Sequence, residues 1–460
     1  MDLKPTEQLA DFAAGTTYES LPQSARLFAR NLLLDSMASA LAGDFGDETV
    51  TYARFARAAG GIGDSTVIGS AESLSLLGAT LLNGYMITTV TVCDTYLPAH
   101  VHISPEIIPP ALALAERDRC DGQALLAAIA IGAEVATRVA AGIDYSVAGK
   151  RGWHFPGIVG PFGSAAAVGS LRRLTPLRMR NAFGLAGSQS AGSWASWGSP
   201  AVKFHQSRGA ASGLLAGLLA EQDFAASAEI LAHPDGGIFS AYSDGGKPEA
   251  AVADLGRRYE FEQIALRLWP GGTPAQSALT AAFDLLADDP PDFDEIERVR
   301  IDVPPNVHAA HTRFATPEGK FEALLSFQFL IARILRHGAL WLDAFEPRHV
   351  TDPGIRDFMR DRIELVADPN LTFGCSRVTL FLPDGETRSV QSDAAKGSPD
   401  NPATLDELRT KYASCVAGRL NDADSAELLD ILVRLDEVGD LSRLFTLLGS
   451  AGARPLPNQI

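Results

Sequence analysis

Helical spacing of apolar residues, with Ala and Gly unusually frequent among them, runs through the first 265 residues and constrains the fold more than any other feature. This spacing is found in residues 24–43, 73–90, 104–117, 122–142 and 163–174. Small side chains let helix axes approach closely, because the side chains at a contact set the distance between two helices. These segments therefore predict a tightly packed, all-helical core.

A different pattern begins near residue 266. Residues 296–305 alternate polar and apolar side chains as a strand does, and residues 378–391 predict a hairpin with Asp-Gly in its turn. An amphipathic helix is expected between them, over residues 321–340, and residues 404–448 return to helical spacing. This order of elements predicts a second domain that contains both helices and strands.

We therefore predict a mainly α protein, built from a large all-α helical domain and a smaller α+β lid domain. The all-α domain takes residues 1–265, and the lid takes residues 266–395. The helices within residues 396–460 are expected to pack back on the first domain. A chain of 460 residues is long enough for this division, since a single core rarely grows to such a size.

The negative charge of the chain limits its partners. Lys and Arg number 39 against 56 for Asp and Glu, which gives a formal net charge of −17. A field of this sign repels nucleic-acid phosphates and anionic membrane surfaces, so we expect neither as a partner. A small anionic substrate would have to be held by a local cluster of cations.

Two features bear on location. The apolar stretch 124–143 carries Glu134 and Arg138, which is typical of a buried core helix rather than a membrane span. The N-terminal residues lack the apolar core of a secretion signal, and the four cysteines are scattered without CxxC spacing. We therefore predict a cytoplasmic protein.

A first polar cluster lies in the loop CDTYLPAHVHISPE, residues 93–106. Its candidate site residues are Asp94, Thr95, His100 and His102. Two histidines and one acid could ligate a metal, but no second acidic or histidine-rich segment accompanies them, so we predict no metal site. A polar loop that caps the following helix, with Ser104 and Pro105 at its start, explains the same residues.

A second cluster lies in residues 144–167, where basic residues stand beside a Gly-rich stretch that leads into a helix. Its candidates are Tyr145, Arg151 and His154. The glycines fit either close approach of a ligand to the backbone or tight helix packing. His154 taken alone fits a satisfied interior histidine as well as a base.

A third cluster lies in SPAVKFHQSRGAASG, residues 199–213. Lys203, His205 and Arg208 precede a run that we expect to be helical from AASG onward, so backbone N–H groups at that helix start would add to the side-chain charge on a carboxylate or phosphate. A solvated basic turn is the alternative. Arg267, in RLWPGG at the junction of the two expected domains, is a further candidate, since ligands commonly bind between domains.

These clusters, in this order and spacing, resemble the 2-methylcitrate dehydratase family (the MmgE/PrpD superfamily) over nearly the whole chain. NG followed by CDT and His102 is similar to the family's NG…DFDDTH…HPS block, and GWHFPGIVGPFGSAAA is similar to GxHPTGTxGxFGAAAA. SPAVKFHQSRGAASGLLAGLLA resembles MxKxxHxGxAAxxGLLAALLA, the most specific block. RLWPGG, FEALLSFQF and KGSPDNPATLDELRTKY resemble three later blocks.

The resemblance implies a large all-α domain with a smaller α+β lid, a homodimer and no cofactor. The implied chemistry is proton abstraction next to a carboxylate in a small di- or tricarboxylate. Carried over by position, the site residues are Asp94, Thr95, His102, His154, Lys203 and His205, with Arg267 where the family usually has Lys. We assign catalysis to His102, His154, Lys203, Asp94 and Thr95, and substrate binding to His205, Arg267, Arg151, Tyr145 and His100.

Several positions depart from the family pattern. Thr91 and Cys93 stand where the family has acids, and Thr88 stands where a histidine is common. Gln276 replaces a histidine, and Phe329 replaces a tyrosine and cannot donate a proton. Polar groups that serve dehydratase or decarboxylase members are therefore missing, which argues against 2-methylcitrate itself as the substrate.

The predicted function is a cofactor-independent lyase that abstracts a proton α to a carboxylate, either a dehydratase of a 2-methylcitrate-like hydroxy acid or a decarboxylase. The alternative is an epimerase or isomerase of a dicarboxylate such as iminodisuccinate. The second alternative, motivated by the missing acids, is a family member that only binds carboxylates.

Overall fold

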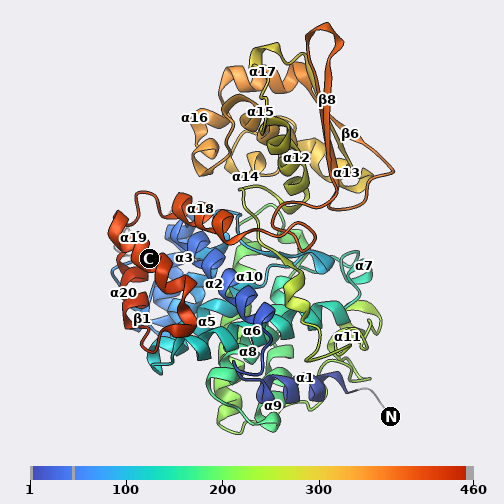
Figure 1. The fold of residues 1–460 in the computed structure, drawn as a ribbon. Helices are drawn as coiled ribbons and strands as arrows, with labels where there is room; N and C mark the ends of the chain where they lie inside the picture. The colour runs from blue at the N-terminus through green and yellow to red at the C-terminus, as the bar shows by residue number, and fades with distance from the viewer. Residues whose placement is uncertain (1–3, 44–46, 452–460) are drawn as a thin grey trace. The chain divides into compact units, whose positions relative to one another are not determined.

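The computed structural model describes residues 4–43 and 47–451 (Figure 1). The chain divides into two compact units, one made of Met1–Ile264 with Leu405–Ile460 and the other of Ala265–Thr404. The first is almost entirely helical and the second mixes helices with a four-stranded sheet, which confirms the predicted fold class.

The helices of the first unit are α1 (Pro5–Gly15), α2 (Gln23–Leu41), α3 (Asp47–Gly60), α4 (Leu76–Thr88), α5 (Ser104–Arg117), α6 (Gly122–Gly142), α7 (Tyr145–Ala148), α8 (Pro156–Leu171), α9 (Pro176–Gly187), α10 (Ala201–Glu221), α11 (Ile238–Ser243), α18 (Leu405–Val416), α19 (Asp422–Val433) and α20 (Ser442–Ser450). Its short strands are β1 (Ile62–Thr66), β2 (Ser73–Leu74) and β3 (Thr95–Tyr96), and β4 (Ile264–Ala265) lies where the chain passes to the second unit. Figure 1 shows the C-terminal helices beside the blue N-terminal ones, and α18 and α19 both pack against α2.

Helix α8 is the centre of the first unit and packs against α5, α6, α9 and α10. Glycines set how closely these helices approach. A Cβ on Gly132 of α6 would lie 2.8 Å from the carbonyl oxygen of Gly163 in α8, and a Cβ on Gly163 would lie 2.7 Å from that of Gly132. The small residues of the sequence therefore permit backbone-to-backbone packing.

Helix α6 is long and apolar enough to cross a membrane, but it is buried within the unit. Its Glu134 and Arg138 form an ion pair with a nitrogen–oxygen distance of 2.5 Å, and neither side chain is exposed. Arg138 also donates hydrogen bonds to the carbonyl oxygens of Ala253 and Arg258. These contacts satisfy the buried charges and tie α6 to the chain that follows α11.

The second unit contains α12 (Gln276–Leu286), β5 (Arg298–Val303), α13 (Pro305–His311), α14 (Lys320–Ala323), α15 (Phe327–His337), α16 (Pro347–Val350), α17 (Pro353–Arg362), β6 (Ile363–Ala367), β7 (Ser376–Phe381) and β8 (Thr387–Ser392). The strand order is β6-β5-β7-β8, with β5 and β6 parallel and the other pairs antiparallel. Alternate residues such as Val299 and Ile301 of β5, opposite Leu380 and Val378 of β7, face a core to which α12 and α15 contribute.

Three predicted helix boundaries are wrong. The helix expected from residue 163 begins at Pro156, as α8. The helix expected over 321–340 is interrupted after Ala323, and α15 starts afresh at Phe327, where the Ser326 hydroxyl accepts a hydrogen bond from the Phe329 backbone N–H. The helix expected from AASG begins instead at Ala201. Lys203, His205 and Arg208 therefore lie inside α10, and the N–H groups that follow them do not lie at a helix start.

Candidate active site

The loop before α5 is closed by the carboxylate of Asp94, which is fully buried. Its oxygens accept hydrogen bonds from the backbone N–H of Ile103 (2.9 Å) and from the backbone N–H and hydroxyl of Ser104 (3.2 and 2.5 Å). Burial raises the pKa of Asp94 to about 6, although the bonds from Ser104 and Ile103 oppose the rise. Asp94 thus caps α5 and fixes the path of the loop that carries His102.

His102 is oriented by the backbone of the same aspartate. Its Nδ1 lies 2.6 Å from the carbonyl oxygen of Asp94, and the Thr95 hydroxyl lies 3.4 Å from the same nitrogen. A carbonyl oxygen only accepts hydrogen bonds, so Nδ1 must carry the proton. In the neutral ring Nε2 then carries no proton, and its lone pair can accept one.

His154 and His205 form a direct imidazole pair, with their Nδ1 atoms 3.0 Å apart. His154 precedes α8 and is 7% exposed, whereas His205 lies in the second turn of α10. A hydrogen bond between two Nδ1 atoms needs one N–H and one lone pair, so the neutral rings must be opposite tautomers. One ring then presents a bare Nε2 and the other presents an Nε2–H, which makes the pair both a proton acceptor and a proton donor.

The surroundings keep this pair neutral. Burial, with contributions from the charges of His205 and His102, lowers the pKa of His154 to about 3. Burial, assisted by the Arg208 guanidinium, also lowers the pKa of His205. His102 lies in the loop before α5, which packs against both α8 and α10, so the three histidines of the sequence prediction lie in one region of the first unit.

The connection between α9 and α10 lies against the pair, and sequence analysis missed it. The carbonyl oxygen of Gly192 accepts a hydrogen bond from the His154 backbone N–H (3.1 Å). A Cβ on Gly192 would lie 2.9 Å from the carbonyl oxygen of His154 and 3.4 Å from Nδ1 of His205. The ring of Trp194 lies 5.7 Å from that of His154. A larger residue than Gly at 192 would crowd the pair.

Lys203 lies two residues before His205 on α10. Its Nζ forms an ion pair with Glu48 of α3 and lies 5.9 Å from the centre of the Tyr85 ring. The Tyr85 ring stacks on that of Tyr52 at 4.0 Å. Glu48 is distant in sequence and belongs to no recognisable motif, so sequence analysis gave no reason to pair it with Lys203.

Arg208 has a structural role. Its guanidinium donates hydrogen bonds to the carbonyl oxygens of Gln189, Gly157 and Ala191 at 2.7, 2.9 and 2.7 Å. These bonds join α10 to the start of α8 and to the connection after α9. The expected cluster of three cations is therefore reduced to Lys203, because His205 belongs to the neutral imidazole pair and Arg208 holds the surrounding backbone.

The remaining predicted residues lie in three places. Tyr145 contacts the His100 ring (4.9 Å) and the Phe155 ring (5.0 Å), and burial lowers the pKa of His100 to about 4. Arg151 is partly exposed and paired with Asp244. Arg267 belongs to the second unit, where it is buried and donates to the carbonyl oxygen of Gly271 (3.2 Å).

The departures from the family pattern have packing roles. The side-chain amide of Gln276 donates to the carbonyl oxygens of Trp269 and Gly271, at 3.1 and 3.2 Å. Phe329 lies in the core of the second unit, 5.8 Å from the Phe345 ring. Cys93 is buried with its sulfur 3.8 Å from Nδ1 of His102.

A buried acid, Glu106, escaped the sequence analysis. It lies in the first turn of α5 and is fully buried, and within residues 4–43 and 47–451 neither carboxylate oxygen has a hydrogen-bond partner. Its side chain fills the space that a Cβ would take at Gly160 of α8, and it also borders Gly209, one turn beyond His205 on α10. Burial and the nearby Asp94 raise the pKa of Glu106 well above its ordinary value. Its place inside an otherwise apolar helix was the only sequence signal.

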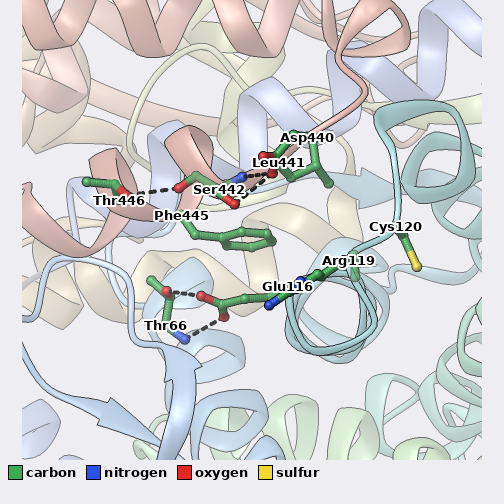
Figure 2. Close-up of a pocket in the computed structure, with 10 residues that line it drawn as sticks. Thr66, Glu116, Arg119, Cys120, Asp440, Leu441, Ser442, Phe445 and Thr446 are labelled. Carbon is green, nitrogen blue, oxygen red and sulfur yellow. Dashed lines mark hydrogen bonds between the residues drawn. The ribbon is translucent and has the colours of Figure 1, made fainter.

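A hollow of about 260 Å³ at the other end of α5 is shown in Figure 2. Its acids are already engaged: Glu116 accepts hydrogen bonds from the Thr66 backbone and hydroxyl, and Asp440 accepts two from Ser442. A 14-residue helix is about 20 Å long, so this hollow is remote from the histidines at the start of α5. In the described part of the chain no three His, Cys, Asp or Glu side chains come together as metal ligands would.

Fold and geometry together define a class of protein: a mainly helical protein with a smaller α+β unit, whose helical unit holds a buried imidazole pair close to a lysine on the same helix as one of the two rings. Comparison with known families gives the particular family. The MmgE/PrpD N-terminal domain matches residues 7–251, and the MmgE/PrpD C-terminal domain matches residues 269–437. The chain belongs to the MmgE/PrpD family, as its sequence blocks predicted.

Curated relatives cover almost the whole chain at low identity. A cis-aconitate decarboxylase-like protein, oryM, of Aspergillus oryzae is 26% identical, over 96% of this chain and 97% of its own length. The cis-aconitate decarboxylase of Mus musculus is 25% identical, over 96% of this chain and 93% of its own. That of Homo sapiens is 25% identical, over 80% and 79%. The chain is thus a lyase-like enzyme of carboxylate chemistry.

Proposed function

We propose that this enzyme is a lyase that moves a proton at the carbon next to a carboxylate of a small tricarboxylate, with decarboxylation of an unsaturated tricarboxylate as its reaction. The observation that carries the proposal is the His154–His205 pair, whose hydrogen-bonded rings, with centres 5.1 Å apart, hold one unprotonated Nε2 and one Nε2–H. The curated relatives named cis-aconitate decarboxylases support decarboxylation rather than dehydration.

Each residue of the site has a part in this proposal. Loss of carbon dioxide leaves negative charge that spreads from carbon into a neighbouring carboxylate, and Lys203 would stabilise that charge. The Nε2–H of the imidazole pair would then protonate the carbon, and the pair would regain its proton from solvent, with the unprotonated Nε2 of His102 as a relay for that proton. Asp94 and Thr95 position His102 rather than react themselves. Arg267, Arg151, Tyr145 and His100 remain predicted substrate-binding residues.

Glu48 fits the same scheme as a counter-ion. Its carboxylate is paired with Lys203, and a substrate carboxylate would take its place. An exchange of one carboxylate for another keeps the lysine paired throughout, which limits the desolvation cost of an unpaired charge. At Lys203 the binding free energy of the substrate is then the difference between the free energies of two ion pairs, one with the substrate carboxylate and one with Glu48.

Two other reactions would use the same groups. A dehydratase of a 2-methylcitrate-like hydroxy acid needs an acid aimed at a hydroxyl, and an epimerase needs a proton donor on each face of the carbanion. The decarboxylase and the dehydratase differ from the epimerase in releasing carbon dioxide or water, so product analysis separates all three.

The test is NMR of the purified protein in D2O with cis-aconitate, citrate, methylcitrate, malate and iminodisuccinate. Decarboxylation predicts consumption of an unsaturated tricarboxylate, release of carbon dioxide, and one deuterium on the carbon that is protonated. Loss of water from a hydroxy acid would assign a dehydratase, and exchange with inversion and no new compound would assign an epimerase. Binding without turnover of any of the five would overturn the proposal.

A matched pair of variants ties turnover to the site. His154→Gln removes one partner of the imidazole pair and should lower turnover by about 10²–10⁴-fold. His337→Gln changes an exposed histidine at the end of α15 and should leave it unchanged. Equal loss in both variants would mean that the chemistry does not depend on His154.

We also propose that the enzyme is a homodimer in the cytoplasm. The family resemblance supports the dimer, as do exposed apolar side chains on α3 and α10, namely Phe55, Phe204, Leu215 and Leu219. All four cysteines lie in the described part of the chain and none of them forms a disulfide there, which suits a reducing compartment. Light scattering after size exclusion tests the dimer, since a mass of one 48.8 kDa chain would exclude it.

A further inference from the structure

Lys411 connects the C-terminal part of the chain to the loop that carries the site. It lies on α18, its side chain is 2% exposed, and its Nζ donates to Oδ1 of Asp35 on α2 (2.5 Å). The same Nζ donates to the carbonyl oxygen of Val92 (2.6 Å). One buried ammonium group therefore joins three segments that are far apart in sequence.

The peptide that Lys411 holds is two residues from the carbonyl that orients His102. Val92 is fully buried and follows Thr91, whose φ of 56° lies in the left-handed region. From Val92 the chain runs through Cys93 to Asp94, whose carbonyl oxygen accepts the Nδ1 proton of His102. Only two residues separate the Val92 carbonyl, which Lys411 binds, from the Asp94 carbonyl, which binds His102. Few backbone dihedral angles are free between them, so fixing the Val92 carbonyl restrains the direction of the Asp94 carbonyl.

We propose that Lys411 is a positioning residue for the active site: by binding the Val92 carbonyl it sets the direction of the Asp94 carbonyl, and so keeps the proton of His102 on Nδ1 and leaves Nε2 bare. This inference rests on the role proposed above for His102. It gives the C-terminal helix α18 a part in the chemistry although α18 contributes no reacting group.

The simpler account is that Lys411 and Asp35 are a buried ion pair that only joins α18 to α2. Removing one partner of such a pair is strongly destabilising, so Lys411→Met alone cannot distinguish the two accounts. The double variant Lys411→Met/Asp35→Leu can. Replacement of both buried charges by apolar groups is commonly neutral or stabilising, whereas the Val92 carbonyl still loses its donor.

The readout is the 15N signals of the histidine rings in the full-length protein labelled at histidine, with His102 assigned by its loss in His102→Gln. The inference predicts that the double variant regains the melting temperature lost in Lys411→Met but not the protonated Nδ1 of His102. Turnover should remain at least tenfold below wild type. Recovery of the His102 signal together with the melting temperature would overturn the inference.

Two further variants keep the test decisive. Asp35→Asn retains Lys411 and its bond to Val92, so the His102 signal should persist; its loss there would also overturn the inference. Arg138→Met/Glu134→Leu removes a second buried ion pair, in which Arg138 also donates to a backbone carbonyl elsewhere in the unit. This double variant should leave the His102 signal unchanged. Because the ring signals need no substrate, a failed turnover assay would count against the proposed function without affecting this result.

Discussion

The Nδ1 atoms of His154 and His205 lie 3.0 Å apart, which requires the two neutral rings to be opposite tautomers. The pair therefore contains one proton donor, the Nε2–H of one ring, and one proton acceptor, the unprotonated Nε2 of the other ring. Burial keeps it neutral by lowering the pKa of both rings. The pair can therefore give a proton on one side and take one on the other without an added charge.

Because the two rings act as one unit, their contributions to turnover should not add. His154→Gln and His205→Gln are each expected to lower kcat by about 10²–10⁴-fold, the usual contribution of general acid–base catalysis. The loss of kcat in the double variant should be no larger than the loss in the less active of the two single variants. Steady-state kinetics on the substrate found in the panel measures all three, and multiplicative losses would show that the rings act independently.

Lys203 and Glu48 should have opposite effects on carboxylate binding. Lys203→Met removes the cation and is expected to lower kcat/KM at least 100-fold. Glu48→Gln frees the lysine and should tighten binding severalfold, because the substrate no longer displaces a carboxylate. Steady-state kinetics measures the first effect and calorimetric titration with a tricarboxylate measures the second, and weaker binding to Glu48→Gln would contradict the counter-ion role.

The buried Glu106 predicts a specific pH dependence of stability. Its unfolded pKa is near 4.5 and its folded pKa is well above that, so between these values the folded state keeps a proton that the unfolded state has released. The wild-type free energy of unfolding must therefore fall as pH rises through this window. Glu106→Gln removes the effect, so its stability relative to wild type should rise from pH 4.5 upward.

A matched acid of opposite behaviour provides the control for Glu106. The exposed Glu427 accepts a hydrogen bond from Arg443, which lowers its pKa. Glu427→Gln should lose stability relative to wild type as pH rises through the ordinary glutamate range. Urea unfolding at several pH values measures both variants, and a falling Glu106→Gln difference would contradict the assignment of a buried neutral acid.

Acid should weaken the fold through His154. Its pKa is about 6.5 when unfolded and about 3 when folded, so below pH 6.5 the unfolded state binds a proton that the folded state does not. Stability is complete above pH 6.5 and declines by up to about 1.4 kcal/mol per pH unit as pH falls toward 3. His154→Gln should show a shallower decline between pH 6.5 and 5, and an equal slope would contradict the burial argument.

The close contact of α6 and α8 predicts a large cost for one methyl group. A Cβ on Gly163 would lie 2.7 Å from the Gly132 carbonyl oxygen and 2.7 Å from the Ala136 Cβ. Gly163→Ala should therefore lower the free energy of unfolding by about 1–3 kcal/mol, the usual cost of overpacking. Gly15→Ala, at the end of α1 where a Cβ meets nothing within 4 Å, is the control and should change it little.

Much of the fold could be predicted because helix periodicity is a local signal. The expected helices over 104–117 and 122–142 coincide with α5 and α6, where Pro105 and Asp121 mark the starts. Both alternating segments are strands, and their pairing in one sheet follows their apolar faces. The break after Ala323 was missed because amphipathic spacing continues across it, although Ser326, which caps α15, is a local signal for a new helix start.

The site was predictable in its residue types and not in its pairings. Spacing pointed to His102, His154 and His205, but the contact between the last two joins segments 51 residues apart. No local pattern assigns Glu48 to Lys203, or Lys411 to Val92. Arg208 belonged to the same basic run as Lys203, yet three backbone carbonyls occupy it, and only the three-dimensional structure distinguishes those two cations.

The measurement that tests the central claim most directly is deuterium incorporation from D2O into the product, compared between wild type and His154→Gln at saturating tricarboxylate. In wild type the account predicts one deuterium per turnover, at a carbon next to one of the two remaining carboxylates. In His154→Gln it predicts undiminished binding and a rate of deuterium incorporation reduced at least 100-fold. Undiminished incorporation in a folded His154→Gln protein would contradict the account, because the proton would then come from another group.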